Sequence, residues 1–113
     1  MIKAKLIKNS LNTYTKDLIV NSFELEAADG ILEAQLELIL AERVEYLLAN
    51  QLEFFFAAMY RMDVEESKIH QALGDRNIKP SLKIARLIIQ RQKEKQASRE
   101  KYRSDSNFFD DSF

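Results

Sequence analysis

Few residues in this sequence could carry out chemistry, and their spacing indicates no reaction. His70 is the only histidine, there is no cysteine, and the two glycines cannot form a glycine-rich loop that cradles phosphate. No serine has a general base at a sequence spacing that would bring the two together, so the sequence indicates no activated serine nucleophile. We therefore expect no catalytic residue, no cofactor and no enzymatic activity.

Glu66 and His70 form the one spacing that could begin a metal site. The two residues are four positions apart, which on a helix places them on the same face. Helical di-iron proteins need a Glu-x-x-His spacing supplied twice, and this chain has neither that spacing nor a second histidine. We interpret the pair as an ordinary contact on a helix surface, and no metal is expected.

The elements that carry these residues are expected to be helices in one domain. The chain has 113 residues, and two glycines and one proline provide few of the tight turns that a β-sandwich or a nucleotide-binding α/β fold needs. Apolar residues recur at three- and four-residue intervals between Ile31 and Leu48. The sequence predicts an all-α fold, a small bundle of about four helices near residues 31–49, 51–62, 64–73 and 81–102.

The ends of the chain are expected to differ from this bundle. Residues 1–20 show no decisive period and are predicted to be an irregular N-terminal arm, followed by a helical domain over 21–103 and an acidic aromatic tail over 104–113. Asn21 followed by Glu24 has the spacing of a helix-capping box. The absence of cysteine and of an apolar signal core favours the cytoplasm, and the longest apolar run, 54–60, is too short to span a membrane.

The helix over residues 52–60 is unusual because its apolar residues surround the whole cylinder. Eight of these nine residues are apolar. Such a helix is either the central element of a bundle or is covered by a second chain. We expect the second case, with homo-oligomerisation or a protein partner, through the large side chains Phe54, Phe55, Phe56, Met59 and Tyr60.

Arg43 falls within the apolar stripe of the helix over 31–49, where an unpaired guanidinium would be costly. It should therefore form a structural ion pair, and Glu53 and Asp63 are the expected partners. The alternatives are an arginine that binds a ligand, or a stripe that is an interface with the charge at its rim.

The last helix is basic. Residues 83–103 hold eight bases and two acids, whereas residues 24–66 hold eleven acids and two bases. The second half of this helix, after Gln90, is expected to project into solvent with its cations spread around the cylinder: Lys93, Lys95, Arg99, Lys101 and Arg103. Nonspecific contact with nucleic-acid phosphates is one reading. A solvated helix, or one that lies on the acidic middle of its own chain or a neighbour, is the favoured one.

The tail combines three acids with Phe108, Phe109 and the terminal Phe113, as a short docking peptide would. It loosely resembles the acidic, Phe-ended tails of bacterial single-stranded DNA-binding proteins. Two other stretches, Tyr60-Arg61-Met62-Asp63-Val64-Glu65-Glu66-Ser67-Lys68 and Leu87-Ile88-Ile89-Gln90-Arg91-Gln92-Lys93, resemble short, uncharacterised all-helical bacterial proteins. That group has no activity to carry over, so the resemblance implies only a bacterial origin.

Two hypotheses follow from the sequence. The first is a non-enzymatic helical subunit for protein–protein interaction or assembly, which self-associates through the apolar helix. The alternative is a nucleic-acid-associated regulatory protein that contacts phosphates through the basic C-terminal helix.

Overall fold

The computed structural model describes the backbone of residues 10–110 and the side chains of residues 10–103. Within that range the fold is all-α, as the sequence predicts, with no strand. Its helices are α2 (Thr13–Phe23), α3 (Glu33–Asn50), α4 (Leu52–Arg61), α5 (Glu66–Gly74) and α6 (Pro80–Asp110). The last four lie near the predicted ranges, except that α6 continues past the expected end near residue 102.

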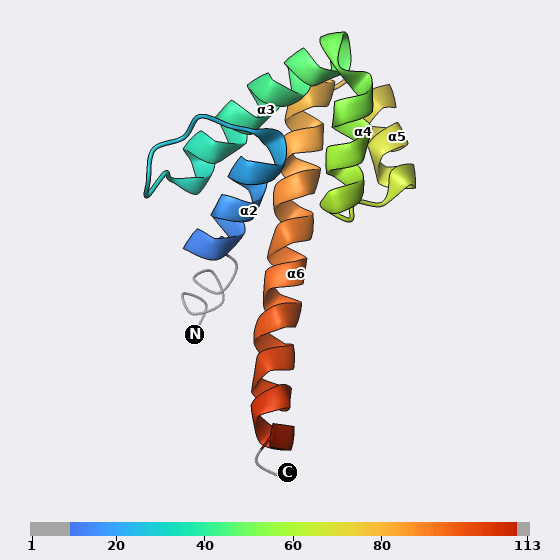
Figure 1. The fold of residues 1–113 in the computed structure, drawn as a ribbon. Coiled ribbons are helices and arrows are strands. Elements are labelled where there is room, and N and C mark those ends of the chain that lie inside the picture. Colours follow the sequence, from blue (N-terminus) through green and yellow to red (C-terminus); the bar gives the residue numbers. More distant parts are fainter. Residues whose placement is uncertain (1–9, 111–113) are drawn as a thin grey trace.

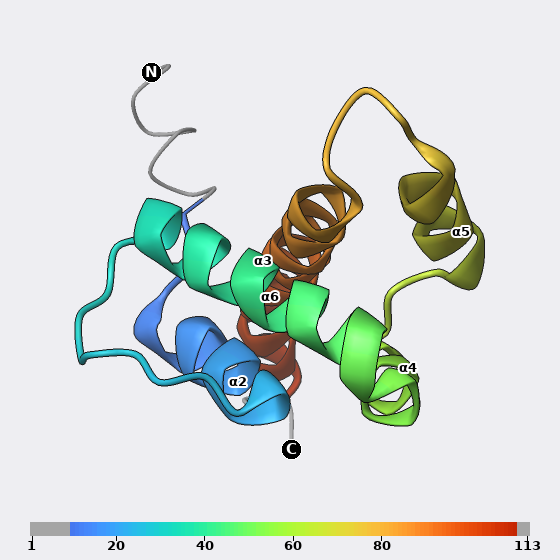
Figure 2. The ribbon, with the colours of Figure 1, turned by 90° about the horizontal axis from the view of Figure 1, so that it is seen from above.

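Helix α6 is the axis of the molecule. Helix α3 packs across its N-terminal half, α2 lies on one side of it, and α4 and α5 lie on the other (Figures 1 and 2). Helix α4 connects the two sides, because it contacts both α3 and α2. At about 1.5 Å per residue, the 31 residues of α6 extend over about 46 Å, and the C-terminal part projects beyond the other helices (Figure 1).

All five helices contribute fully or nearly fully buried side chains to one core. Its largest buried apolar members are Ile19, Phe23, Leu36, Leu40, Val44, Leu47, Phe55, Met59, Ile84 and Ile88. The residues from α3 recur at three- and four-residue spacing, which is why the sequence pattern located this helix correctly. The core therefore joins α2, α3, α4 and α5 to the first half of α6.

The expectation of an irregular arm through residue 20 is wrong from Thr13 onward, where α2 begins. The Asn12 side chain caps this helix by accepting a hydrogen bond from the Thr15 amide, 2.8 Å away. Thr15, Ile19 and Phe23 are four residues apart and buried on one face. Because the first of them is polar, the stripe does not stand out in the sequence. Residues 1–9 of the predicted arm lie outside the described residues.

Asn21 and Glu24, read from the sequence as the start of a helix, lie instead at the end of α2. Glu24 adopts a left-handed conformation with φ of 53°. The Leu25 amide then donates to the Val20 carbonyl at 2.9 Å, which closes the helix C-terminus. A polar residue followed three positions later by an acid occurs at helix N-termini and at helix C-termini. The spacing alone therefore does not distinguish the start of a helix from its end.

The basic half of α6 does not leave the domain after Gln90, contrary to the prediction. Gln92 and Gln96 are buried, and their side-chain amides donate to the Met62 and Ser10 carbonyls at 2.8 and 2.9 Å. The Gln96 side chain also accepts from the Asn12 amide at 2.9 Å. These two glutamines attach the α4–α5 loop and the start of α2 to α6. Among the described side chains of α6, those beyond Arg99 form no hydrogen bond with another part of the chain.

The C-terminal prediction falls largely outside what is described. The backbone of α6 runs on to Asp110, so residues 104–110 are helical where a separate tail was expected. The side chains of Phe108 and Phe109 lie outside the described ones, and Phe113 lies outside the described residues. Among the helices of residues 10–110, none is long and apolar enough to cross a membrane.

Candidate functional site

Helix α4 is half buried and half exposed, and its exposed half is apolar. Phe55, Ala58 and Met59 are buried in the core, and Phe54 is partly buried against it. The sequence grouped Phe54, Phe55, Phe56, Met59 and Tyr60 as one interaction set. The structure divides that set, because Phe55 and Met59 belong to the core whereas Phe56 and Tyr60 face outward.

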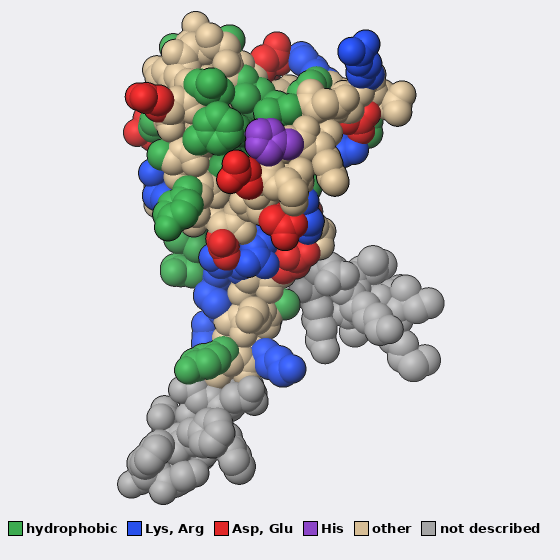
Figure 3. All heavy atoms as spheres, turned by 90° about the vertical axis from the view of Figure 1, so that its right-hand side faces the viewer, with side chains coloured by type: hydrophobic (Ala, Val, Ile, Leu, Met, Phe, Trp, Pro, Cys, Tyr) green, Lys and Arg blue, Asp and Glu red, His purple; other side chains and the backbone are tan. Residues whose placement is uncertain are grey.

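The outward side of α4 presents three large apolar residues at four-residue intervals. Leu52 is 51% exposed, Phe56 41% and Tyr60 87%. Helical residues four apart are neighbours on the surface, so the three form a continuous row along the helix. On the side of the molecule that carries α4 and α5, hydrophobic side chains gather next to the single histidine (Figure 3).

This row lies among residues that suit the approach of another helix. Ala57 is exposed and has the smallest side chain on the outward surface of α4. Glu53 and Arg61 are exposed at opposite ends of the helix, four residues to either side of Ala57. We call this surface the α4 face and define it by Leu52, Glu53, Phe56, Ala57, Tyr60 and Arg61. It is apolar in the middle, with one negative and one positive end.

Arg43 is partly buried, with its side chain 24% exposed, and is held by several groups. Its Nε donates to the Phe23 carbonyl at 2.9 Å, and its guanidinium lies 5.5 Å from the ring centres of both Tyr46 and Phe54. Its carboxylate neighbour is Glu24 at 3.5 Å, not Glu53 or Asp63 as the sequence reasoning expected. The left-handed end of α2 explains the difference, because it turns the Phe23 carbonyl and Glu24 toward α3.

The acidic middle of the chain lies against the basic helix. Glu33 is 2.6 Å from Lys93, and Glu37 is 3.4 Å from Arg86, so two carboxylates of α3 pair with cations of α6. A third, Glu45, is 2.8 Å from Lys79, just before α6 begins. Part of the charge segregation in the sequence is therefore neutralised within one molecule.

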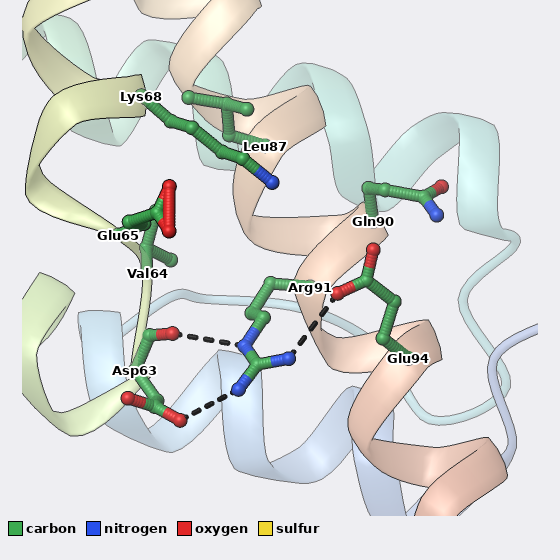
Figure 4. Close-up of a pocket in the computed structure, with 8 residues that line it drawn as sticks. All are labelled: Asp63, Val64, Glu65, Lys68, Leu87, Gln90, Arg91 and Glu94. Carbon is green, nitrogen blue, oxygen red and sulfur yellow. Dashed lines mark hydrogen bonds and ion pairs between the residues drawn. The ribbon is translucent and has the colours of Figure 1, made fainter.

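A polar hollow forms where the α4–α5 loop meets α6 (Figure 4). Its centre is Arg91, whose Nε donates to the Asp63 carbonyl at 2.9 Å while one terminal nitrogen lies 2.7 Å from the Asp63 carboxylate. The other terminal nitrogen lies 3.2 Å from Glu94. Lys68 and Gln90 also line the hollow. Arg91 thus fixes the α4–α5 loop to α6 by binding both the backbone carbonyl and the side-chain carboxylate of Asp63.

The conformation of Asp63 makes this attachment possible. Its φ of 58° is left-handed, and it lets the Val64 amide donate to the Met59 carbonyl at 3.2 Å, closing α4. The hydrogen bond from Arg91, followed by the charge of Lys95, lowers the pKa of the Asp63 carboxyl below its ordinary value. The same hydrogen bond raises the pKa of the Arg91 guanidinium. Both groups therefore carry their charges at neutral pH.

Next to this polar hollow, a second and more open hollow follows one side of α6. We call it the α6 hollow; it is lined by Arg91, Glu94, Lys95, Ser98, Arg99, Tyr102 and Arg103. The sequence reasoning placed Lys95, Arg99 and Arg103 on different sides of the helix, and that is wrong for these three. They share a surface with Arg91 and with Tyr102, which is 74% exposed.

Arg99 joins the α6 hollow to the start of α2. Its guanidinium lies 5.3 Å from the centre of the Tyr14 ring, and a terminal nitrogen donates to the Thr15 hydroxyl at 2.9 Å. Neither contact is with a carboxylate. The other residues of the predicted basic set lie elsewhere: Lys93 pairs with Glu33, and Lys101 is exposed outside the α6 hollow.

His70 and Glu66 form an i,i+4 contact on the surface of α5, with 3.6 Å between the imidazole Nε2 and a carboxylate oxygen. Both side chains are largely exposed. Within the described part of the chain, no three His, Cys, Asp or Glu side chains come together as metal ligands would.

Comparison with the models of known protein families, with curated proteins and with solved structures gives no match for this chain. Its function must therefore be argued from the two surfaces described above, the α4 face and the α6 hollow.

Proposed function

We propose that this protein is a non-enzymatic assembly subunit that self-associates through the α4 face. The observation that carries the proposal is the exposed row of Leu52, Phe56 and Tyr60 on a short helix whose other side already fills the core. Contiguous exposed apolar surface of this kind is typical of protein interaction sites. The intramolecular pairing of α3 acids with α6 bases also engages Arg86 and Lys93, two of the cations that a nucleic-acid-binding function would use.

A second copy of the same face fits this surface by size and charge. In a two-fold symmetric contact, each copy presents the same patch to the other, so the patch must complement itself. If two α4 helices pack antiparallel about Ala57, Glu53 of one copy lies near Arg61 and the Tyr60 hydroxyl of the other. The small Ala57 side chains at the centre allow the helices to approach closely. The opposite charges at the two ends then favour the antiparallel direction.

The direct test is Ala57→Glu, which places two carboxylates at the centre of the proposed contact. The association constant should fall by at least about ten-fold, measured by sedimentation velocity over a range of concentrations. Ala34→Glu is the matched control, because Ala34 is an exposed helical alanine in the first turn of α3, outside the α4 face. It should leave the association unchanged.

The predicted direction of packing has its own test. Glu53→Arg brings two arginines together in the antiparallel contact and should weaken association, whereas Glu53→Arg combined with Arg61→Glu should restore it. Far-UV circular dichroism checks that each variant is folded, since Arg61 also donates to the Ser22 carbonyl at 3.1 Å. Equal association of Ala57→Glu and wild type would rule out the α4 face as the contact.

A further inference from the structure

The α6 hollow has a composition that neither the core nor the α4 face explains. Four cations and one carboxylate line it, together with the exposed ring of Tyr102. Lys95 is 3.7 Å from Asp63, a carboxylate that Arg91 already holds, and Arg99 has no carboxylate partner among the described residues. The hollow therefore has excess positive charge beside aromatic and aliphatic surface.

We propose that the α6 hollow binds the C-terminal segment, residues 104–113, of a second copy of the chain. The inference concerns a surface separate from the α4 face, so it goes beyond the proposed function and does not need it to be correct.

The chemistry of the C-terminal segment complements the hollow. The segment contains three aspartates and three phenylalanines and no lysine or arginine. Its carboxylates match the lysine and arginine groups, and its phenylalanines match Tyr102 and the aliphatic stems of the cationic side chains. Arginine also packs well over aromatic rings, as Arg99 does over Tyr14 at 5.3 Å.

Nucleic acid is a weaker fit for the same surface. A phosphate backbone needs a series of free cations, whereas Arg91 and Lys95 already share Asp63. A short peptide with three acids and three aromatic rings needs fewer free cations and uses the apolar part of the hollow as well.

The C-terminal segment of the same molecule cannot fold back onto the Lys95 end of the hollow. Helix α6 continues without a break from Pro80 to Asp110, so it carries residues 104–110 away from Lys95 along the helix axis. Lys95 lies fifteen residues before Asp110, which is about 22 Å along a helix. The remaining residues of the segment, 111–113, can span about 10 Å at most. The occupant must therefore come from another copy.

An antiparallel pair of α6 helices provides that occupant with a simple register. A two-fold axis near Arg103 places residues 105–110 of one copy opposite residues 96–101 of the other. The basic stretch of each helix then faces the acidic segment of its partner, twice over. Beyond Arg99, helix α6 projects past the other helices, which leaves the residues around Arg103 open to a second helix (Figure 1).

The test uses two full-length charge-reversal variants in the Ala57→Glu background, which removes the α4 contact. The hollow variant carries Lys95→Glu and Arg103→Glu, and the segment variant carries Asp110→Lys and Asp111→Lys. Each variant alone should associate at least about ten-fold more weakly than the Ala57→Glu parent. An equimolar mixture should recover the parent's affinity, because both of its contacts then pair opposite charges. Native mass spectrometry identifies the mixed species.

Two results would overturn the inference. One is a mixture that associates as weakly as either variant alone. The other is unchanged association in both variants. If the hollow variant also loses binding of a labelled single-stranded oligonucleotide at low salt, the hollow is a nucleic-acid surface. The Ala57→Glu background separates this test from the test of the α4 face. The α4 proposal fails only if Ala57→Glu associates as strongly as the wild type.

Discussion

Phe55→Ala and Phe56→Ala change adjacent residues of the same type, yet they should differ several-fold in their effect on stability. Phe55 is fully buried, whereas Phe56 is 41% exposed. Removing a buried phenylalanine costs about 3–5 kcal/mol, through lost burial and the cavity that is left. For Phe56 the loss within one molecule is smaller: part of the burial energy of its ring, plus the edge-to-face contact with Phe55 at 5.1 Å between ring centres, which adds about 0.5–1.5 kcal/mol.

The assay is urea unfolding followed by far-UV circular dichroism, at a protein concentration low enough that self-association adds nothing to stability. Phe55→Ala should lower the free energy of unfolding by at least twice as much as Phe56→Ala. If Phe55→Ala does not fold, Phe55→Leu retains most of the apolar volume and keeps the comparison possible. In the association assay the order should reverse. Phe56→Ala should weaken self-association more than Phe55→Ala does, because only Phe56 belongs to the α4 face. Equal losses of stability for the two alanine variants would refute the division of α4 into a buried and an exposed half.

Three further predictions concern the polar contacts inside the molecule. Gln92→Ala leaves the Met62 carbonyl without its donor and should cost about 1–3 kcal/mol in urea unfolding; a loss below about 0.5 kcal/mol would show that the hydrogen bond is dispensable. Arg43→Lys should lower the thermal midpoint nearly as much as Arg43→Ala, because an ammonium group cannot both donate to the Phe23 carbonyl and stack on two rings, and full recovery by lysine would contradict this. The lowered pKa of Asp63 means that its stabilising effect is fully present above about pH 5 and is lost as the pH falls through its folded-state pKa. Asp63→Asn should therefore differ from wild type at pH 7 and converge with it in acid, and a difference independent of pH would exclude the ion pair as its source.

Helix α3 could be predicted because its apolar residues recur at regular spacing and face one core. Helix α4 could be predicted from its nearly all-apolar composition, and Gly74 and Pro80 mark the end of α5 and the start of α6. Helix α2 could not, because its buried stripe begins with Thr15 and depends on a cap by Asn12 that resembles many polar loops. The sequence also could not show that buried Gln92 and Gln96 hold α6 to the domain, since glutamines in a charged stretch usually face solvent. Long-range carbonyl partners, 30 and 86 residues away, decide their position.

The candidate surfaces were predicted to different degrees. Excess apolar surface on α4 could be read from composition, but its division between Phe55 and Phe56 depends on how α4 packs against α3 and α2. The α6 hollow was not predicted because the cations of the last helix were expected to be spread around it, although every lining residue belongs to that helix. One available signal was the helical spacing of Lys95, Ser98 and Tyr102, which places them on a single side of the cylinder.

The central claim is that the chain assembles with itself, and sedimentation velocity of the wild-type protein over a hundred-fold concentration range tests it most directly. We predict a sedimentation coefficient that rises with concentration from the monomer toward a dimer or a larger species, and a rise that is reduced in Ala57→Glu but not in Ala34→Glu. A single monomeric species at every concentration would contradict the account.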